Sequence, residues 1–250
     1  MKLKGAINFR DLGGHVSVQG HKLKPGQFFR SGALNKLTSE DVILLQTQVG
    51  HVIDFRDPSE AQHDKDVLWE GVAYENCPAN PVAYRMSANL GSFFTKEHLE
   101  NIPPQYMEKL YRTLPFDNQA YHRMFAVLDE MQGTKGMLQH CAVGKDRTGV
   151  GTALMLIGLG VDENQVMQDY LATQTGLEPF RNNLMTQFQG ILSGKAMEGF
   201  QYMMGAHESF LGAALEEMKS KSGSVQKFLL SEYGVTDQRR AKWQQKFFEP

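Results

Sequence analysis

A ten-residue stretch between an apolar strand and an apolar helix constrains this chain more than any other feature. It reads His140-Cys-Ala-Val-Gly-Lys-Asp-Arg-Thr-Gly149, after the strand-like run of residues 136–140 and before the apolar residues 150–159. A loop at the N-terminus of a helix can turn several backbone N–H groups inward, where the helix dipole adds to their positive field. The stretch therefore predicts a strand-loop-helix unit with an anion-binding loop.

The side chains of this loop indicate what the anion is. Cys141 and Arg147 bracket five residues, and the planar guanidinium of an arginine can hold two phosphate oxygens at once. Gly144 permits the backbone angles that a tight loop requires. The field that attracts a phosphate also favours a thiolate at Cys141; we expect Thr148 to donate a hydrogen bond to its sulfur and Lys145 to add a charge at the rim. The pattern predicts attack of the sulfur on phosphorus, through a phosphocysteine intermediate.

The overall charge narrows the range of partners. The chain has 26 Lys and Arg against 28 Asp and Glu, a net charge of −2, which gives no general footprint for nucleic acid or an anionic membrane. Its longest apolar run, residues 153–159, is too short to span a bilayer. The two cysteines, Cys77 and Cys141, form no zinc-ligand cluster, and Arg147 with the loop amides can balance the phosphate charge. We therefore expect no metal and no cofactor.

The rest of the chain reads as an α/β fold in which strands come early and helices late. Thr38 and Asp41 form a capping-box pattern ahead of an amphipathic helix that ends near Val49. We find no repeat and no linker, so residues 1–250 are predicted to form a single domain with a mainly helical C-terminal part. Strands are expected at 26–31, 51–56, 72–74 and 136–140, helical spacing at 106–111 and 121–131, and helix breaks near Gly194, Gly205 and Gly223.

Residues 78–104 interrupt this pattern. They mix prolines and a glycine with two exposed-looking aromatic residues, Phe93 and Phe94. A segment this long without clear periodicity is typical of a functional lid or insertion. The depth of the predicted pocket, which separates phosphotyrosine from the shorter phosphoserine, depends on how this segment packs.

A second element, Asn8-Phe-Arg-Asp-Leu-Gly-Gly14, adds a family resemblance to the loop. The chain resembles the cysteine-based protein tyrosine phosphatases, and more closely the bacterial branch that carries both elements. That branch includes phosphatases of phosphotyrosine and, in some members, of phosphoserine/threonine and phosphoinositides. The resemblance implies a central sheet flanked by helices. It covers nearly the whole chain apart from residues 78–104, with further matches at Phe29-Arg-Ser31, Leu37-Thr38, Val52-Ile-Asp-Phe-Arg56, Asp169-Tyr-Leu171, Ser224-Val-Gln-Lys-Phe-Leu and Tyr233-Gly-Val235.

The resemblance implies a role for each matching position. Cys141 corresponds to the nucleophile, Arg147 to the phosphate-binding arginine and His140 to the residue that supports the loop from behind. The phosphate cradle corresponds to the backbone amides of Ala142, Val143, Gly144, Lys145, Asp146 and Arg147. Further supporting positions are Thr148, Arg10, Asp11 and Arg56. A pair between Arg10 and Asp11 would fix the N-terminal segment beside the loop, and a structural ion pair would equally explain Arg56.

The general acid is the position at which this chain departs from many tyrosine phosphatases, because it contains no Trp-Pro-Asp sequence. Asp146, beside Arg147 in the loop itself, is the best candidate, in an arrangement similar to that of myotubularin-type lipid phosphatases. The lesser candidates are Asp54, Asp57 and Asp117. The alternative for Asp146 is a salt bridge that orients Arg10, Arg30 or Arg56.

The sequence thus predicts a cysteine-dependent protein-tyrosine-phosphatase that binds a phosphate ion in the loop and acts on a phosphorylated protein or a phosphoinositide. Two alternatives stay open: a phospho-ligand-binding module without turnover, and another cysteine enzyme with an oxyanion loop, such as a rhodanese-like sulfurtransferase or an arsenate reductase. The first residues contain no apolar stretch of signal-peptide length, so we expect a cytoplasmic protein, with export by a route without a cleavable signal left open.

Overall fold

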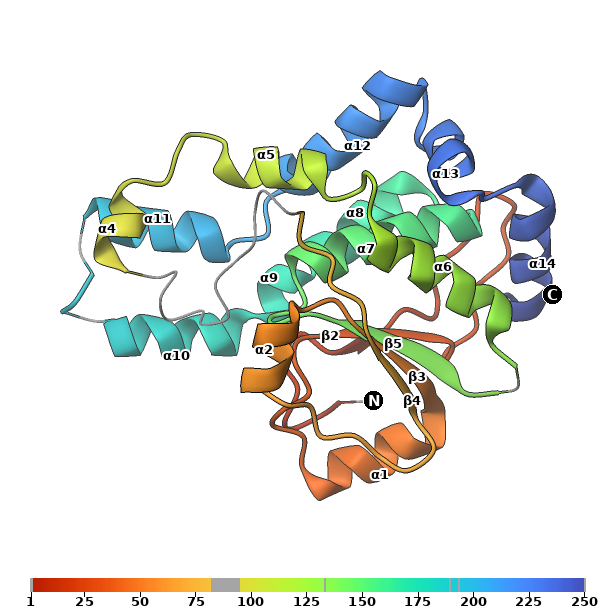
Figure 1. Cartoon of the computed structure of the whole chain (residues 1–250), viewed down its shortest axis with the longest axis horizontal. Coiled ribbons are helices and arrows are strands. Elements are labelled where there is room, and N and C mark those ends of the chain that lie inside the picture. Colours follow the sequence, from red (N-terminus) through yellow and green to blue (C-terminus); the bar gives the residue numbers. More distant parts are fainter. Residues whose placement is uncertain (1, 82–94, 133, 189, 193, 250) are drawn as a thin grey trace.

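The fold is centred on a five-stranded sheet, seen in the computed structural model of the chain (Figure 1). The structure describes residues 2–81, 95–132, 134–188, 190–192 and 194–249. The strands are β1 (Arg10–Asp11), β2 (Phe28–Ser31), β3 (Val49–Asp54), β4 (Ala73–Asn76) and β5 (Gly136–His140), in the spatial order β1-β2-β5-β3-β4. β1 runs antiparallel to β2, and the other neighbouring strands are parallel.

β5 is buried along its whole length, as expected for a central parallel strand that is covered on both faces. Its last residue, His140, is level with Ser31 of β2 on one side and with Asp54 of β3 on the other. The carboxyl ends of three parallel strands therefore meet at one edge of the sheet. Ligand sites of open α/β sheets lie at this edge, and the predicted anion loop leaves β5 directly there.

Helices form the other layers. In chain order they are α1 (Ser39–Gln48), α2 (Pro58–His63), α4 (Lys96–Glu100), α5 (Tyr106–Thr113), α6 (Gln119–Glu130), α7 (Asp146–Leu159), α8 (Glu163–Leu171), α9 (Thr173–Gly176), α10 (Glu178–Phe188), α11 (Lys195–Met204), α12 (Glu208–Ser222), α13 (Val225–Tyr233) and α14 (Asp237–Phe247). Figure 1 shows α1 on one side of the sheet and α6, α7 and α8 on the other. α7 is buried from its second residue to its last, so the helix that follows the loop is the central helix of the larger layer.

Alternate residues of the strands divide between two hydrophobic clusters, because successive side chains of a strand point to opposite faces. On one face, Phe29, Val52 and Leu138 pack with Leu45 of α1. On the other face, the strand residues Phe28, Ile53 and Met137 belong to the larger cluster that contains α6, α7 and the C-terminal helices. The sheet is therefore fixed from both sides, which holds the loop after β5 in place.

The predicted elements are confirmed, with shifts at their ends. The capping box at the start of α1 is present, since the Thr38 hydroxyl accepts from Asp41 N and the Asp41 carboxylate accepts from Thr38 N. The C-terminal part is mainly helical, and its helices end or begin at the predicted glycines. α7 begins at Asp146, earlier than the apolar run suggests, because a carboxylate at a helix N-terminus is stabilised by the helix dipole. Arg147 therefore stands in the first turn of a helix.

Of the predicted insertion at 78–104, residues 82–94 lie outside the described residues. Its described end carries α4, which packs closely on α11: a Cβ atom on Gly199 would lie 2.2 Å from the carbonyl oxygen of Leu99. A lid role for the segment stays a prediction. Within the ranges given above, no helix has both the length and the apolar character needed to cross a membrane.

Candidate active site

Three consecutive carbonyl groups of the loop are tied to the body of the protein. The carbonyl of Ala142 accepts from a backbone N–H of the segment after β2 at 3.0 Å. The side-chain amide of Asn8 donates to the carbonyls of Val143 (3.3 Å) and Gly144 (2.8 Å), and Arg30 Nη2 donates to the latter at 2.8 Å. Since these carbonyls point into the protein, the amides between them are free to face the other way. This is the arrangement of an anion cradle.

Two positions in a left-handed backbone conformation make this geometry possible. Gly144 has φ +68°, and a Cβ atom on it would lie 2.3 Å from the carbonyl oxygen of Ser31, so the predicted need for glycine is confirmed. Asn8 has φ +53°, a conformation that asparagine tolerates better than most residues. The Asn-Phe-Arg element was recognised as a motif, but the role of its first side chain in fixing the loop was missed.

The structure brings the three predicted catalytic side chains together. Cys141 is the first residue after β5 and is 2% exposed. Together with Asp146 and Arg147 it lines a narrow, mostly apolar pocket. The apolar walls come chiefly from α5, α10 and α11, through Tyr106, Met107, Leu110, Phe180, Met203 and Met204. The expected hydrogen bond from Thr148 to the sulfur is wrong, because its fully buried hydroxyl oxygen has no hydrogen-bond partner within the described part of the chain.

Arg147 is held by a carboxylate that sequence reasoning missed. Its Nη1 and Nη2 atoms lie 2.6 and 3.0 Å from the two carboxylate oxygens of Glu60 in α2, and both side chains are buried. Burial by itself lowers the pKa of Arg147, but the charges of Cys141 and Glu60 outweigh it and raise that pKa above its usual value. The guanidinium therefore stays charged next to the sulfur.

A local signal for Glu60 was present in the sequence. Asp57-Pro-Ser-Glu60 is a capping-box pattern, and Glu60 Oε2 accepts from the backbone N–H of Asp57 at 2.8 Å. The box orients the glutamate at the start of α2, with Pro58 at the first helical position. The pattern predicts the helix start, but the contact to Arg147 depends on how α2 sits against the end of the sheet.

Asp146 lies at the pocket of Cys141 rather than in an ion pair with Arg10, Arg30 or Arg56. Its Oδ1 atom accepts a hydrogen bond from Tyr111 Oη at 2.8 Å and lies 3.4 Å from Lys145 Nζ. Its side chain keeps 21% of its surface exposed. The alternative of a salt bridge to Arg10, Arg30 or Arg56 is wrong, because these arginines pair with other aspartates.

Lys145 does not stand at the rim. It is 1% exposed, and its Nζ donates to the carbonyl of Met203 and, at 3.0 Å, to that of Gly205. These carbonyls belong to the C-terminal end of α11, where the helix dipole attracts a cation. The rim prediction is therefore wrong, and the lysine instead links the loop to α11.

The expected pair between Arg10 and Asp11 is also wrong. Arg10 Nε lies 2.8 Å from Asp169 Oδ1, and its Nη1 donates to Asn8 Oδ1 at 2.6 Å. Arg30 Nη1 lies 2.6 Å from the other oxygen of Asp169. Burial raises the pKa of Asp169, but the two arginines outweigh it and lower the pKa to about 2. Arg10 thus fixes the N-terminal segment beside the loop, as expected, through Asp169 in α8.

Asp11 has a separate structural role. Its two carboxylate oxygens accept from the backbone N–H groups of Gly13 and Gly26, each at 2.8 Å. These bonds hold together the segment that follows β1 and the segment that precedes β2. Asp11 therefore supports the strand pair next to the loop and does not reach the pocket.

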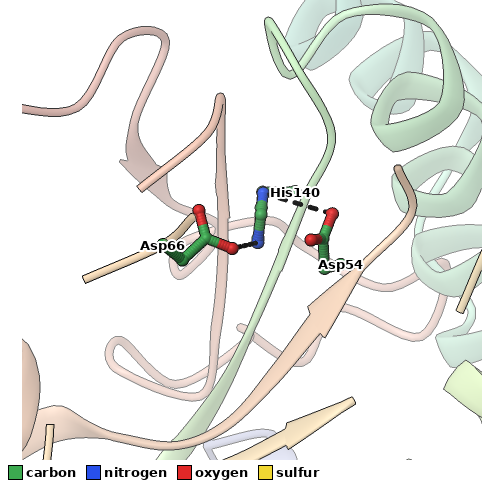
Figure 2. Close-up of side chains that lie close together, drawn as sticks. All are labelled: Asp54, Asp66 and His140. Atoms are coloured by element: carbon green, nitrogen blue, oxygen red, sulfur yellow. Dashed lines mark ion pairs between the residues drawn. The ribbon is translucent and has the colours of Figure 1, made fainter. Parts of the chain in front are cut away.

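His140 lies behind the loop in a buried ionic cluster (Figure 2). Its Nε2 is 3.2 Å from Asp66 Oδ2, and its Nδ1 is 3.8 Å from Asp54 Oδ1. Burial lowers the pKa of His140, but the two aspartates outweigh it and raise that pKa above its ordinary value. His140 thus ends β5 directly before Cys141, and its support of the loop stays a prediction.

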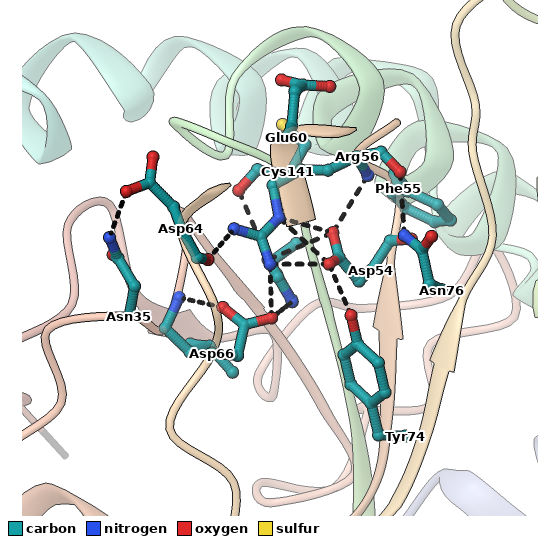
Figure 3. A network of polar contacts seen from close by, with 12 residues as sticks. Asn35, Asp54, Phe55, Arg56, Glu60, Asp64, Asp66, Tyr74, Asn76 and Cys141 are labelled. Atoms are coloured by element: carbon teal, nitrogen blue, oxygen red, sulfur yellow. Dashed lines mark hydrogen bonds and ion pairs between the residues drawn. The ribbon is translucent and has the colours of Figure 1, made fainter. Parts of the chain in front are cut away.

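Arg56 completes this cluster, and Figure 3 shows it between Asp54 and Asp66, with Tyr74 reaching Asp54. Its Nε and Nη2 contact the carboxylate of Asp54, and its Nη2 lies 2.6 Å from Asp66. Asp54, Asp66 and His140 are close enough together to hold a metal ion, but the guanidinium already uses both carboxylates. The geometry therefore favours an ion-pair cluster that supports the end of β3.

The three lesser candidates for the general acid lie outside the lining of this pocket. Asp54 is fully buried and binds Arg56. Asp57 is the N-cap of α2 and accepts from the side-chain amide of Asn80 at 2.9 Å. Asp117 lies at a turn, with its backbone N–H bonded to Glu232 of α13. Asp146 is the only one of the four that lines the pocket of Cys141.

Comparisons with known proteins show which family the chain resembles. A family model described as the tyrosine phosphatase family matches residues 1–249. The chain is 26% identical over 228 residues to a Cupriavidus necator protein whose name assigns it provisionally to the tyrosine-protein phosphatases, covering 89% of this chain and 80% of that protein. It is also 26% identical over 208 residues to the triple specificity protein phosphatase PtpB of Mycobacterium tuberculosis, covering 75% of this chain and 74% of that protein.

Proposed function

The chain belongs to the tyrosine phosphatase family, and on this basis we propose that it hydrolyses phosphate monoesters through a phosphocysteine on Cys141. The observation that carries the proposal is the position of this thiol. It lies at the start of a loop whose carbonyls are tied back, in one pocket with Arg147 and Asp146. We take residues 1–250 as one catalytic domain.

In the first step, substrate phosphate binds to the loop amides and to the guanidinium of Arg147. The sulfur of Cys141 attacks phosphorus, and the bond from phosphorus to the leaving oxygen breaks. Asp146 gives its proton to that oxygen, so the alcohol or phenol leaves neutral. Glu60 holds two nitrogens of Arg147, which limits rotation of the guanidinium and keeps its charge where the transition state needs it.

In the second step, the carboxylate of Asp146 takes a proton from water. The hydroxyl oxygen attacks phosphorus, the bond from sulfur to phosphorus breaks, and its electron pair returns to Cys141 as a thiolate. Inorganic phosphate leaves the loop, and the protonated aspartic acid is ready for the next cycle. The same side chain thus serves as acid and then as base.

The substrate proposed is phosphotyrosine, with phosphoserine/threonine and phosphoinositides as further candidates. The walls of the pocket support an aromatic leaving group, because Tyr106, Phe180 and the methionines of α11 offer apolar surface beside the sulfur. The name of the Mycobacterium tuberculosis relative supports a broader specificity. Lys145 lines this pocket, but its ammonium group is buried and bonded to two carbonyls of the α11 terminus, so it gives little support for an anionic lipid headgroup.

A phosphate-release assay tests this proposal. A phosphotyrosine peptide, a phosphoserine peptide and a phosphoinositide panel are offered to the wild type and to Cys141→Ser, without added metal and with a chelator. We expect release that requires Cys141 and survives the chelator, highest with the phosphotyrosine peptide. No release by folded wild type, with phosphopeptide binding retained, would instead support the alternative of a binding module.

A further inference from the structure

Two buried tyrosine hydroxyls form a series of hydrogen bonds that ends at the carboxyl group of Asp146. Tyr111 Oη donates to Asp146 Oδ1 at 2.8 Å, and Tyr170 Oη lies 2.8 Å from Tyr111 Oη. The two rings pack edge to face with their centroids 5.9 Å apart, and Phe210 supports the Tyr111 ring from α12. Neither tyrosine was expected at the site, because they come from α5 and α8, far from the loop in sequence.

The hydrogen bond to Asp146 determines which hydroxyl donates and which accepts in this series. Because Tyr111 gives its single hydroxyl proton to Asp146, its oxygen must accept from Tyr170, which fixes both hydrogen atoms. Burial and the charge of Asp146 raise the pKa of each tyrosine well above its ordinary value. Both hydroxyls therefore remain donors at any pH at which the protein would work.

Both contacts found for the Asp146 carboxyl converge on one oxygen. Tyr111 Oη and Lys145 Nζ both lie next to Oδ1, at 2.8 and 3.4 Å, whereas no partner for Oδ2 is seen in the described parts of the chain. A proton on Oδ1 would face two donors, so the neutral acid keeps its proton on Oδ2. The side chain is partly exposed in the pocket of Cys141, where a leaving group would be.

We propose that Tyr111, fixed by Tyr170, is a positioning residue that keeps the transferable proton of Asp146 on Oδ2 and turns this oxygen to the leaving group. The inference rests on the proposed phosphatase function. In the first step the Oδ2–H bond breaks and the leaving oxygen takes the proton; in the second step Oδ2 takes a proton from water. Tyr111 keeps its own proton throughout and donates to Oδ1 in both steps.

The test compares two aryl phosphates, because a poor leaving group needs an acid and a good one does not. Rates are measured for phenyl phosphate and for 2,4-dinitrophenyl phosphate, with the wild type, Tyr111→Phe and Tyr170→Phe. Tyr111→Phe is expected to lower kcat/KM, which reports formation of the phosphocysteine, by roughly tenfold to a hundredfold for phenyl phosphate and by less than about threefold for the dinitrophenyl ester. Tyr170→Phe should show the same selectivity with a smaller loss.

Two controls separate positioning from a general loss of structure. Tyr233→Phe removes another buried hydroxyl, which donates to the carbonyl of Pro115; neither residue lines the pocket, so the change should alter neither rate. Introducing Tyr111→Phe into an Asp146→Ala background should leave the ratio of the two rates unchanged, because the group that it positions is gone.

Equal losses of kcat/KM for both esters in Tyr111→Phe, or the same selective loss of kcat/KM in the Asp146→Ala background, would overturn the role of Tyr111 while the phosphatase proposal stands. Absence of Cys141-dependent turnover of both esters by the wild type would contradict the proposed function itself, and the inference with it.

Discussion

The carboxylate of Glu60 lies 2.6 Å from Nη1 and 3.0 Å from Nη2 of Arg147, and this buried pair joins the start of α2 to the first turn of α7. The pair fixes the guanidinium at the pocket of the only buried cysteine within the described residues. A fixed guanidinium loses little freedom when a phosphate binds, which is the advantage of a preorganised site.

Removing this carboxylate should therefore harm both activity and stability. In Glu60→Gln, the buried Arg147 loses its ion-pair partner, which costs about 3 kcal/mol or more of folding free energy. We expect kcat/KM to fall at least about tenfold and the melting temperature to fall, with millimolar inorganic phosphate restoring part of the lost stability by supplying the missing charge. Calorimetry with and without phosphate measures the melting temperature, and steady-state kinetics measures kcat/KM.

Glu70→Gln is the matched control, since Glu70 is exposed. It should leave both quantities unchanged. Full activity of Glu60→Gln would contradict the role given to the pair.

The side chain of Asn8 should be needed for phosphate binding by the loop and not only for the stability of the fold. Asn8→Ala removes the two hydrogen bonds to Val143 and Gly144, and the loss of hydrogen bonds to buried carbonyls costs about 1–3 kcal/mol. Because the freed carbonyls no longer hold the amides toward the anion, we expect weaker inhibition by phosphate, by about tenfold. Asn164→Ala, at an exposed position of α8, should change neither stability nor inhibition. Unchanged phosphate inhibition in Asn8→Ala would speak against the cradle.

Because Asp169 pairs with two arginines, its contribution to the free energy of unfolding should be lost at low pH. The pKa of Asp169 is lowered from 3.8 to about 2 in the folded chain, so this group stabilises the fold above pH 4. The contribution, about 2 kcal/mol, is lost as the pH falls through the folded pKa. The gap in unfolding free energy between the wild type and Asp169→Asn should therefore narrow by about that amount from pH 5 to pH 2.

Urea unfolding at several pH values measures this gap. Asp237→Asn, which changes an exposed carboxylate, should show no such narrowing. A gap for Asp169→Asn that stays constant from pH 5 to pH 2 would be inconsistent with the lowered pKa.

The strand-loop-helix unit and the N-terminal motif could be predicted from the sequence because they depend on local patterns. An apolar run sets β5, a capping box starts α1, and Gly144 is required by the backbone of the loop. These features involve residues that are close in the chain, where periodicity and turn chemistry decide. The same patterns placed Cys141 and Arg147 at one end of a helix.

The partners of the charged residues could not be predicted in this way. Glu60 and Arg147 are 87 positions apart, and Arg10 and Asp169 are 159 apart. Which of several nearby charges a side chain meets depends on how the elements pack, so Arg10 pairs with Asp169 although Asp11 is its neighbour in sequence. Lys145 shows the same limit. From the sequence alone a lysine in a loop is expected to be exposed, and only the packing of α11 places its terminal carbonyls next to the ammonium group.

The buried position of Lys145 predicts a link between the loop and α11. Lys145→Met removes the ammonium group from the two carbonyls, and the last turn of α11 should exchange its amide hydrogens roughly tenfold faster. Hydrogen exchange followed by mass spectrometry measures this, with the amides of α6 as the internal control. Unchanged exchange at residues 200–205 would mean that the lysine does not hold this helix.

The central claim is that Cys141 carries the phosphoryl group during turnover. Rapid acid quench during hydrolysis of an aryl phosphate, followed by peptide mass spectrometry, tests it most directly. In Asp146→Ala, which lacks the base for the second step, we expect one phosphoryl group per chain, on the peptide that contains Cys141. Phosphate release without a label on Cys141 at any quench time, or a label on another residue, would contradict the account.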